Sequence, residues 1–177
     1  MIMHKILEKR QYSPEVFYLR VEAPEIAKNR HPGQFVIVQI DTNFGERVPL
    51  TIADANAEEG WIALVIQAVG ATPIKLCNKN VGDSIAAILG PLGRPSHITK
   101  CGTVACVCGG IGVAPMYPIA QAFKEAGNKL IVIIGARNKD LIVFEDEMKA
   151  IADELIITTD DGSYGRKALV TVPLKEL

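Results

Sequence analysis

The stretch TVACVCGGIGVAPMYPIAQAFKEAGNKLIVIIGAR (residues 103–137) contains a strand, a glycine-rich turn, a helix and a second strand in succession. Residues 103–110 are mostly apolar and end in glycines, whereas residues 114–128 have a proline near their start and a glycine near their end, which is typical of a helix. Residues 129–137 are largely apolar, like a central parallel strand that is buried on both faces. This alternation predicts a doubly wound parallel sheet with covering helices.

The turn at residues 109–115 reads Gly-Gly-Ile-Gly-Val-Ala-Pro. Glycines allow a tight turn and let a pyrophosphate approach main-chain N–H groups. Pro115 stands where a dinucleotide-binding turn usually has a third small residue, and it fits the start of a helix because its missing N–H costs nothing there. The turn predicts nucleotide binding, with an ordinary glycine-packed β–α turn as the alternative. The residues concerned are Gly109, Gly110, Gly112, Val113 and Pro115.

The alternation continues toward the carboxyl end of the chain. Residues 140–153 predict a second helix, and residues 154–165 predict a third strand that ends in a polar loop. Residues 171–177 have the composition of the first turn of a third helix. Three parallel strands with two helices would leave one face of the sheet uncovered, so we expect an incomplete domain that is truncated or is completed by a partner.

The chain before residue 98 has a different pattern, in which short strands follow one another without long helices between them. Six short runs with the β-branched and aromatic content of strands are separated by Pro, Gly and Asn: residues 4–12, 15–23, 33–40, 48–54, 60–69 and 82–90. They indicate a closed antiparallel barrel or a sandwich, with one short helix at residues 73–78 capped by Thr72. We therefore expect two domains, an antiparallel β-barrel over residues 1–98 and a partial α/β nucleotide-binding domain over residues 99–177.

Composition excludes several classes of function. The 19 basic and 20 acidic side chains give a formal net charge of -1 without a block of like charge, which argues against nucleic acid and membrane surfaces as partners. Charged residues occur within the first five positions, and no apolar run approaches the ~20 residues that span a bilayer. We expect a cytoplasmic protein without membrane insertion.

The four cysteines are Cys77, Cys101, Cys106 and Cys108. Their spacing is a poor match to zinc or iron–sulfur loops, so no metal site is expected. Cys106 and Cys108 lie on one face of the predicted strand, where we expect reduced, buried thiols. A redox role for Cys108, beside the glycine turn, is the alternative.

Two further segments carry groups suited to ligand binding. At residues 47–51, Arg-Val-Pro-Leu-Thr, Arg47 can pair with a phosphate and Thr51 can hydrogen-bond a ring nitrogen. A charged strand start is the alternative for this segment. Residues 70–72, Gly-Ala-Thr, lead into the predicted short helix, whose start can receive an anion.

In their order along the chain, these motifs resemble the ferredoxin–NADP reductase superfamily, whose members have a flavin-binding β-barrel followed by a nucleotide-binding α/β domain. The finer resemblance is to the small subunits of NADH-dependent ferredoxin:NADP oxidoreductase (sulfide dehydrogenase) and to the electron-transfer subunits of dihydroorotate dehydrogenase. The segments that carry it are residues 47–51, 70–72, Gly-Pro-Leu-Gly at 90–93, 109–115, 135–148 and 158–165.

The resemblance implies a role for each of these positions. Arg47 would hold the FAD pyrophosphate, and the Thr51 hydroxyl would lie near flavin N5, the atom that accepts hydride. Pro49 and Leu50 would line the isoalloxazine together with Thr51. Further FAD phosphate contacts would come from Gly70, Ala71 and Thr72. The NAD(P) pyrophosphate would lie against Gly110, Gly112 and Pro115, flanked by Arg137, Asp160, Asp161 and Gly162.

The resemblance also implies an activity and partners. Hydride would pass between NAD(P)H and FAD, and electrons would continue to an iron–sulfur relay in a larger oxidoreductase subunit with further flavin or iron–sulfur centres, or to ferredoxin. A [2Fe–2S] cluster is expected only in a longer form or in a partner. Arg137 can accept the 2′-phosphate of NADP, but similar segments occur in NADH-using relatives, so NAD(H) is slightly favoured. The alternatives are a stand-alone NAD(P)H–flavin reductase and a cofactor-free interaction module that retains the barrel.

Overall fold

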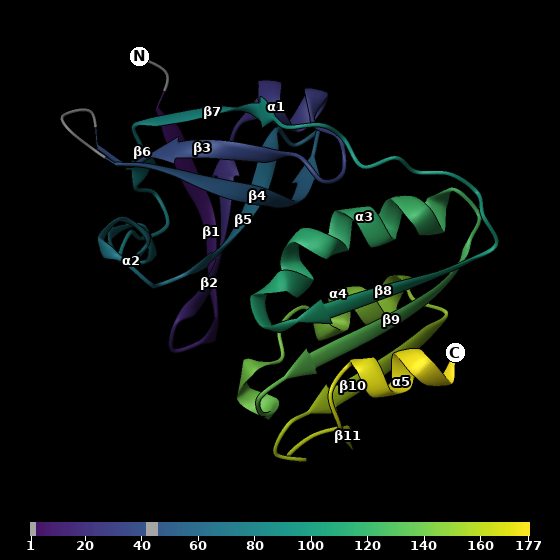
Figure 1. Ribbon diagram of the computed structural model, residues 1–177. Coiled ribbons are helices and arrows are strands. Elements are labelled where there is room, and N and C mark those ends of the chain that lie inside the picture. Colours follow the sequence, from purple (N-terminus) through teal and green to yellow (C-terminus); the bar gives the residue numbers. More distant parts are fainter. Residues whose placement is uncertain (1–2, 42–45) are drawn as a thin grey trace. The chain divides into compact units, whose positions relative to one another are not determined.

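The computed structural model describes residues 3–41 and 46–177. The chain forms two compact units, Met1–Ser96 and His97–Leu177, which we call the amino-terminal and the carboxyl-terminal unit (Figure 1). The division lies within the extended segment that follows residue 93. Within the described ranges, no helix has both the length and the apolar composition needed to cross a membrane.

The amino-terminal unit is an antiparallel near-barrel, which confirms the predicted class of fold. Its seven strands pair in the order β6-β1-β2-β5-β4-β3-β7. The elements are β1 (His4–Ser13), β2 (Val16–Glu22), α1 (Pro24–Asn29), β3 (Phe35–Gln39), β4 (Arg47–Asn56), β5 (Trp61–Gln67), α2 (Ala71–Cys77), β6 (Ser84–Ile85) and β7 (Ala87–Leu92).

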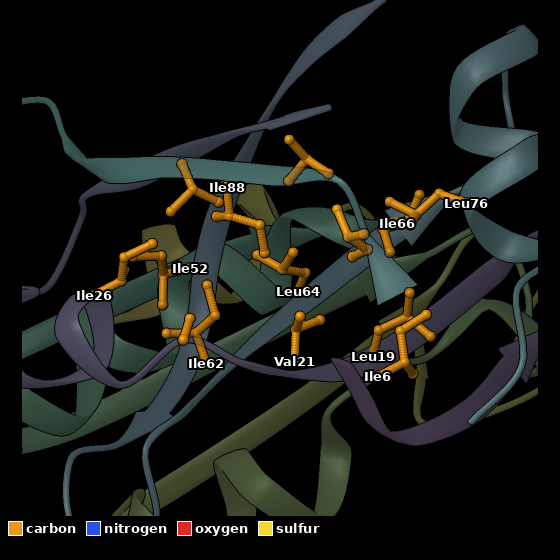
Figure 2. Close-up of a cluster of buried hydrophobic side chains, with 14 of the residues drawn as sticks. Ile6, Leu19, Val21, Ile26, Ile52, Ile62, Leu64, Ile66, Leu76 and Ile88 are labelled. Carbon is orange, nitrogen blue, oxygen red and sulfur yellow. The ribbon is translucent and has the colours of Figure 1, made fainter. Parts of the chain in front are cut away.

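The barrel interior is filled by aliphatic side chains that alternate along the strands. β5 contributes Ile62, Leu64 and Ile66, each at most 1% exposed, and α2 contributes Leu76, which closes one end of the cluster (Figure 2). These side chains come from strands far apart in sequence. The core therefore fixes β4, which carries the Arg47–Thr51 motif, against its neighbours.

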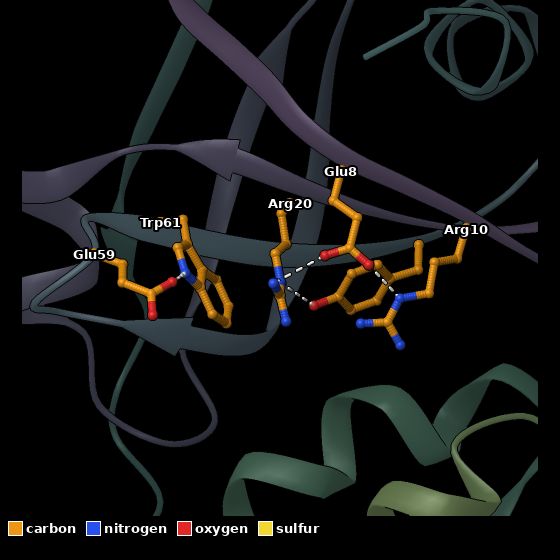
Figure 3. Close-up of polar contacts among 6 residues, drawn as sticks. Glu8, Arg10, Arg20, Glu59 and Trp61 are labelled. Atoms are coloured by element: carbon orange, nitrogen blue, oxygen red, sulfur yellow. Dashed lines mark hydrogen bonds and ion pairs between the residues drawn. The ribbon is translucent and has the colours of Figure 1, made fainter. Parts of the chain in front are cut away.

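The outer face of β1, β2 and β5 is covered by polar side chains. The Arg20 guanidinium lies 4.2 Å above the Trp61 ring, and its Nη1 pairs with Glu8 Oε2 at 2.9 Å (Figure 3). Glu8 also pairs with Arg10, and Trp61 Nε1 donates to Glu59 Oε2 at 2.6 Å. These ion pairs are partly exposed, so each contributes little to stability, at most about 1 kcal/mol.

Besides the additional helix α1, two details of this unit differ from the sequence-based expectation. The run expected as one strand over residues 82–90 is two strands, β6 and β7, separated by Ala86. The short helix begins at Ala71 with Gly70 as its N-cap, so Thr72 does not cap it. Gly70 has a φ of 90°, a conformation that glycine adopts readily, which explains why the helix starts two residues early.

The carboxyl-terminal unit has a parallel four-stranded sheet of order β11-β10-β9-β8. Sequential strand order of this kind is that of one half of a doubly wound sheet. α3 packs on β8 and β9 and against α4, as Figure 1 shows. The elements are β8 (Thr103–Gly109), η1 (Gly110–Gly112), α3 (Val113–Glu125), β9 (Lys129–Ala136), η2 (Lys139–Leu141), α4 (Glu145–Ile151), β10 (Glu154–Thr159), β11 (Arg166–Lys167) and α5 (Thr171–Glu176).

This unit departs from expectation at two places and agrees with it at a third, the final helix. A fourth strand, β11, follows the predicted three. The helix expected from residue 140 begins only at Glu145, because Phe144 adopts a left-handed conformation with φ 59° and is buried. Residues Thr171–Glu176 form α5, and the preceding Val170 packs so closely on β9 that a Cβ at Gly135 would lie 2.3 Å from its Cγ1.

A buried asparagine joins the start of this unit to the end of α3. Asn128 is 3% exposed, and all its side-chain contacts are to main-chain groups. Its Oδ1 accepts the N–H groups of Cys101 (2.7 Å) and Gly102 (3.0 Å), and its Nδ2 donates to the carbonyl oxygens of Thr99 (3.0 Å) and Phe123 (2.8 Å). The side chain thus positions the chain that leads into β8.

Candidate functional site

The motif at residues 47–51 lies on β4. Because side chains alternate along a strand, Arg47, Pro49 and Thr51 share one face and Leu50 points to the other. Leu50 is half-buried and packs against the barrel core, and its role in lining a flavin ring stays a prediction. Arg47 is exposed, and its Nε donates to Gln39 Oε1 at 3.3 Å.

The residues of β3 that pair with this face are polar at one end and apolar at the other. Gln39 pairs with Arg47, Ile37 with Pro49 and Phe35 with Thr51. Paired residues lie on the same side of a sheet. The result is a half-exposed surface with a guanidinium at one end, a hydroxyl at the other and apolar side chains between, which suits a ring system that carries an anionic tail.

The structure links the Gly-Ala-Thr segment to this motif. Thr72 Oγ1 donates to Glu46 Oε2 at 2.5 Å, and Glu46 directly precedes Arg47. Gly70 and Ala71 are exposed, whereas Thr72 is buried. The Thr72 hydroxyl is thus already engaged, so this segment can offer an anion the main-chain N–H groups of Ala71 and Thr72 but not a free hydroxyl.

The glycine turn at the end of β8 leaves room for a ligand. A Cβ built at Gly109, Gly110 or Gly112 would meet no atom within 4 Å. The thirteen-residue α3 follows directly, and its N-cap is Gly112, which has no side chain to cap the helix. Open space at a glycine turn that leads into a helix fits a pyrophosphate. Pro115 is the third residue of α3 and so lies in its first turn, and the Val113 side chain is buried.

The remaining predicted residues lie at the same edge of the sheet. β8, β9 and β10 are parallel, so Gly109, Arg137 and Asp160 all lie at the carboxyl ends of neighbouring strands. The loops after β9 and β10 are joined to each other: Asp160 N donates to Ala136 O (3.0 Å), Asp161 N to Arg137 O (3.2 Å) and Lys139 N to Ser163 Oγ (2.9 Å). The structure thus brings three separate motifs to one edge of the sheet.

A family model described as "Oxidoreductase NAD-binding domain" matches residues 106–160, which contain the turn and both loops' beginnings. A "Dihydroorotate dehydrogenase B (NAD(+)), electron transfer subunit" of Fusobacterium nucleatum is 33% identical over 96% of this chain and 67% of its own length. The chain belongs to the family of dihydroorotate dehydrogenase B electron-transfer subunits and their homologues. This confirms the resemblance to the ferredoxin–NADP reductase superfamily.

Two other relatives of this family are more similar. An electron-transfer subunit homolog of Thermotoga maritima is 43% identical over 99% of this chain and 61% of its own length. A solved structure of NADH-dependent reduced ferredoxin–NADP oxidoreductase, reported for flavin-based electron bifurcation, superposes with a TM-score of 0.92 at 42% identity. The match includes all of this chain and 63% of the chain in the solved structure. The chain thus spans about three-fifths of these two relatives.

Residues beyond the predicted set also lie at this edge of the sheet. Tyr164 donates its hydroxyl to Glu145 Oε1 at 2.7 Å, which raises the pKa of Tyr164, and Lys139 Nζ lies 5.4 Å from the Tyr164 ring centroid. Hydrogen bonds from the side chain and main chain of Ser163 lower the pKa of Asp161. Ser163 and Tyr164 follow the Asp-Asp-Gly motif directly, and this continuation of the polar loop was the available signal.

Three of the four cysteines, Cys77, Cys106 and Cys108, are small buried side chains. Cys106 and Cys108 are each 4% exposed, and burial raises the pKa of the Cys108 thiol to about 12. Burial likewise raises the pKa of Cys77 to about 11. A neutral thiol is a poor nucleophile and a poor metal ligand, which weighs against the redox alternative for Cys108. Among the described residues, no group of three or more His, Cys, Asp or Glu is arranged to hold a metal ion.

We expect iodoacetamide to modify one thiol per native chain at mildly alkaline pH. Cys101 is exposed, whereas the other three thiols are buried. Thiolate is the reactive form, so buried thiols with raised pKa react slowly. Intact mass spectrometry would count the adducts, with urea-unfolded protein, in which all four react, as the control. Rapid modification of Cys108 in the native chain would contradict the burial.

Proposed function

We propose that this chain is the FAD- and NAD(H)-binding part of an electron-transfer oxidoreductase subunit. The observation that carries the proposal is the open glycine cradle at Gly109–Gly112, beside the loops of Arg137 and Asp160, in a chain whose other unit presents Arg47 and Thr51 on one strand face. Supplied with both groups, the protein would use flavin chemistry, in which FAD takes hydride from the nicotinamide and releases electrons singly.

The protein side of this function is binding and orientation. Arg47, with its guanidinium exposed, would pair with the FAD pyrophosphate, and the main chain of Gly70–Thr72 would donate further N–H groups. Thr51 would present its hydroxyl to flavin N5 while Pro49 contacts the ring. The main chain at Gly110 and Gly112, together with the first turn of α3 at Pro115, would hold the NAD pyrophosphate.

The loops after β9 and β10 would contact the adenosine half of the nucleotide. Arg137, Asp160, Asp161 and Gly162 are exposed there. The two carboxylates favour ribose hydroxyls over a 2′-phosphate, which agrees with NAD(+) in the name of the Fusobacterium nucleatum relative. The name of the solved relative contains both NADH and NADP. We therefore propose NAD(H) as the preferred nucleotide, with NADP(H) as the outcome that would reverse it.

The onward electron path would involve other centres. The name of the Fusobacterium nucleatum relative describes a subunit of dihydroorotate dehydrogenase, and the solved relative is a ferredoxin–NADP oxidoreductase. We propose a larger subunit carrying flavin or iron–sulfur centres as the partner, with ferredoxin as a further acceptor. A [2Fe–2S] cluster would reside in that partner or in a longer form of this chain.

An absorption spectrum of the purified chain, recorded before and after addition of NADH and then NADPH, tests the proposal. Flavin bands that bleach with NADH support it. Bands that bleach only with NADPH would reverse the nucleotide preference, and rapid reduction of free acceptors without a partner would favour a stand-alone flavin reductase. A colourless protein that does not take up FAD would instead indicate a cofactor-free interaction module.

Gly112→Val should raise the apparent dissociation constant for NADH at least about tenfold, or ~1.4 kcal/mol, while FAD stays bound. The valine would occupy the open space that the pyrophosphate needs. Gly112 has an ordinary φ of -61°, so the folded chain itself tolerates a side chain there. Titration of the flavin bands with NADH measures the effect, with the thermal midpoint as the control. Unchanged NADH affinity would refute the cradle.

A further inference from the structure

The segment that carries Thr51 is fixed by a buried amide side chain of a residue outside every motif described above. Gln34 precedes β3 and is 8% exposed. Its Oε1 accepts the main-chain N–H of His31 at 2.8 Å, and its Nε2 donates to the carbonyl oxygen of Gly93 at 2.9 Å. This side chain therefore joins the turn before β3 to the turn after β7, 59 residues away.

The main chain of Gln34 contacts β4 immediately beside Thr51. Ile52 N donates to Gln34 O at 3.2 Å, and Gln34 N donates to His31 O at 3.2 Å. The next residue, Phe35, pairs directly with Thr51. A shift of Gln34 would therefore move Ile52 and Thr51 together relative to β3.

The turn at Gly93 packs closely against the same place. Phe35 pairs with Thr51 on one side and with Leu92 on the other. Gly93 has a φ of 83°, and a Cβ there would lie 3.0 Å from the Phe35 ring. The Gln34 amide thus joins Gly93 to β3, the strand that carries Phe35. Because Phe35 pairs with Thr51, Gln34 sets the distances among these three residues.

We propose that Gln34 is a positioning residue for Thr51 and sets where the Thr51 hydroxyl stands relative to a bound flavin ring. This inference rests on the proposed function, because it takes Thr51 to face flavin N5. Gln34 makes no contact with the flavin in this account and acts through the main chain of β3 and β4. Its removal should change the electronic environment of bound FAD without releasing it, since Arg47 and the Gly70–Thr72 segment hold the phosphates.

Gln34→Glu is the sharpest variant, because it keeps shape and the acceptor for His31 N–H but loses the donor to Gly93 O. In the full 177-residue chain loaded with FAD, it should retain FAD and shift the flavin midpoint potential and the visible circular dichroism band. Both shifts should have the same direction as in Thr51→Ala. In the double variant the potential should equal that of Thr51→Ala alone, because the two changes act through one contact.

Gln11→Leu is the matched control, since Gln11 is an exposed glutamine on β1 of the same unit, and it should leave both signals unchanged. A Gln34→Glu chain that melts earlier but keeps the potential and the dichroism of the parent would overturn the inference, as would fully additive shifts in the double variant. If Gln34→Glu does not fold, Gln34→Met gives the same comparison, because it removes both side-chain hydrogen bonds at similar volume. Loss of FAD from both Gln34 variants would also overturn the inference.

The same experiment separates this inference from the proposed function. If Thr51→Ala shifts the potential and Gln34→Glu does not, the role of Gln34 fails and that of Thr51 stands. An unchanged potential in Thr51→Ala removes the role assigned to Thr51 and, with it, the inference for Gln34. A chain that takes up no FAD contradicts both.

Discussion

Replacing Asn128 with alanine should lower the free energy of unfolding of the carboxyl-terminal unit by about 3 kcal/mol. The change removes four hydrogen bonds from a side chain that is 3% exposed. A hydrogen bond contributes about 1 kcal/mol net, and a buried main-chain group left without a partner costs about 1–3 kcal/mol. Four such bonds would give about 4 kcal/mol. Some of the freed groups would regain water, because Cys101 and Gly102 are exposed, which brings the expected total down to about 3 kcal/mol.

Urea unfolding followed by circular dichroism measures this loss, and amide hydrogen exchange in β8 and α3 would place it in the carboxyl-terminal unit. Gln121→Ala is the control, since this half-buried α3 residue makes no side-chain hydrogen bond among the described residues. We expect it to change stability by no more than about 0.5 kcal/mol. A loss below about 1 kcal/mol for Asn128→Ala would contradict the hydrogen-bond network.

Arg47→Ala should weaken FAD binding by about 10- to 100-fold, equal to ~1.4–2.7 kcal/mol. The guanidinium is exposed at the start of β4 and next to Glu46, whose carboxylate is bound by Thr72. Hydrogen bonds to charged groups are the strong ones, so loss of an arginine from a pyrophosphate site is costly. Fluorescence titration of the apoprotein with FAD measures the effect, which should shrink at high salt because the site is exposed.

Two variants separate the guanidinium from charge in general. Arg47→Lys keeps the positive charge but lacks the planar guanidinium, which can bind a phosphate through two N–H groups. It should therefore bind FAD more tightly than Arg47→Ala and less tightly than the parent. Arg30→Ala removes an equal charge at the end of α1 and should leave FAD affinity within twofold of the parent. Equal FAD affinity in Arg47→Ala and the parent would refute the phosphate assignment for Arg47.

The parallel half of the molecule was predictable because its signals are local. The apolar runs at β8 and β9, the glycine turn and Gly127 each act over a few residues. α1 escaped prediction because six residues with a proline at the start carry no periodicity. α4 starts late because Phe144 adopts a left-handed backbone conformation. Tertiary packing imposes this conformation, and the residue type gives no sign of it in the sequence.

The sequence indicated which residues belong to the candidate site better than it indicated the contacts that their side chains make. Sequence motifs indicated the residues on β4 and at the glycine turn, and the binding roles of those residues stay predictions. The buried hydroxyl of Thr72 and the inward Leu50 follow from strand register and long-range contacts. Gln34 and Asn128 were missed because their partners lie as many as 59 and 29 residues away, beyond any local pattern.

The loops after β9 and β10 hold each other through hydrogen bonds donated by Lys139, Asp160 and Asp161. A small molecule that arrives at this edge therefore meets a surface whose conformational entropy was lost when the chain folded. Its arrival needs no loop ordering, so the encounter rate is set by diffusion and charge. In the function that we propose, a nicotinamide nucleotide would thus meet a surface that is already ordered, which favours fast arrival.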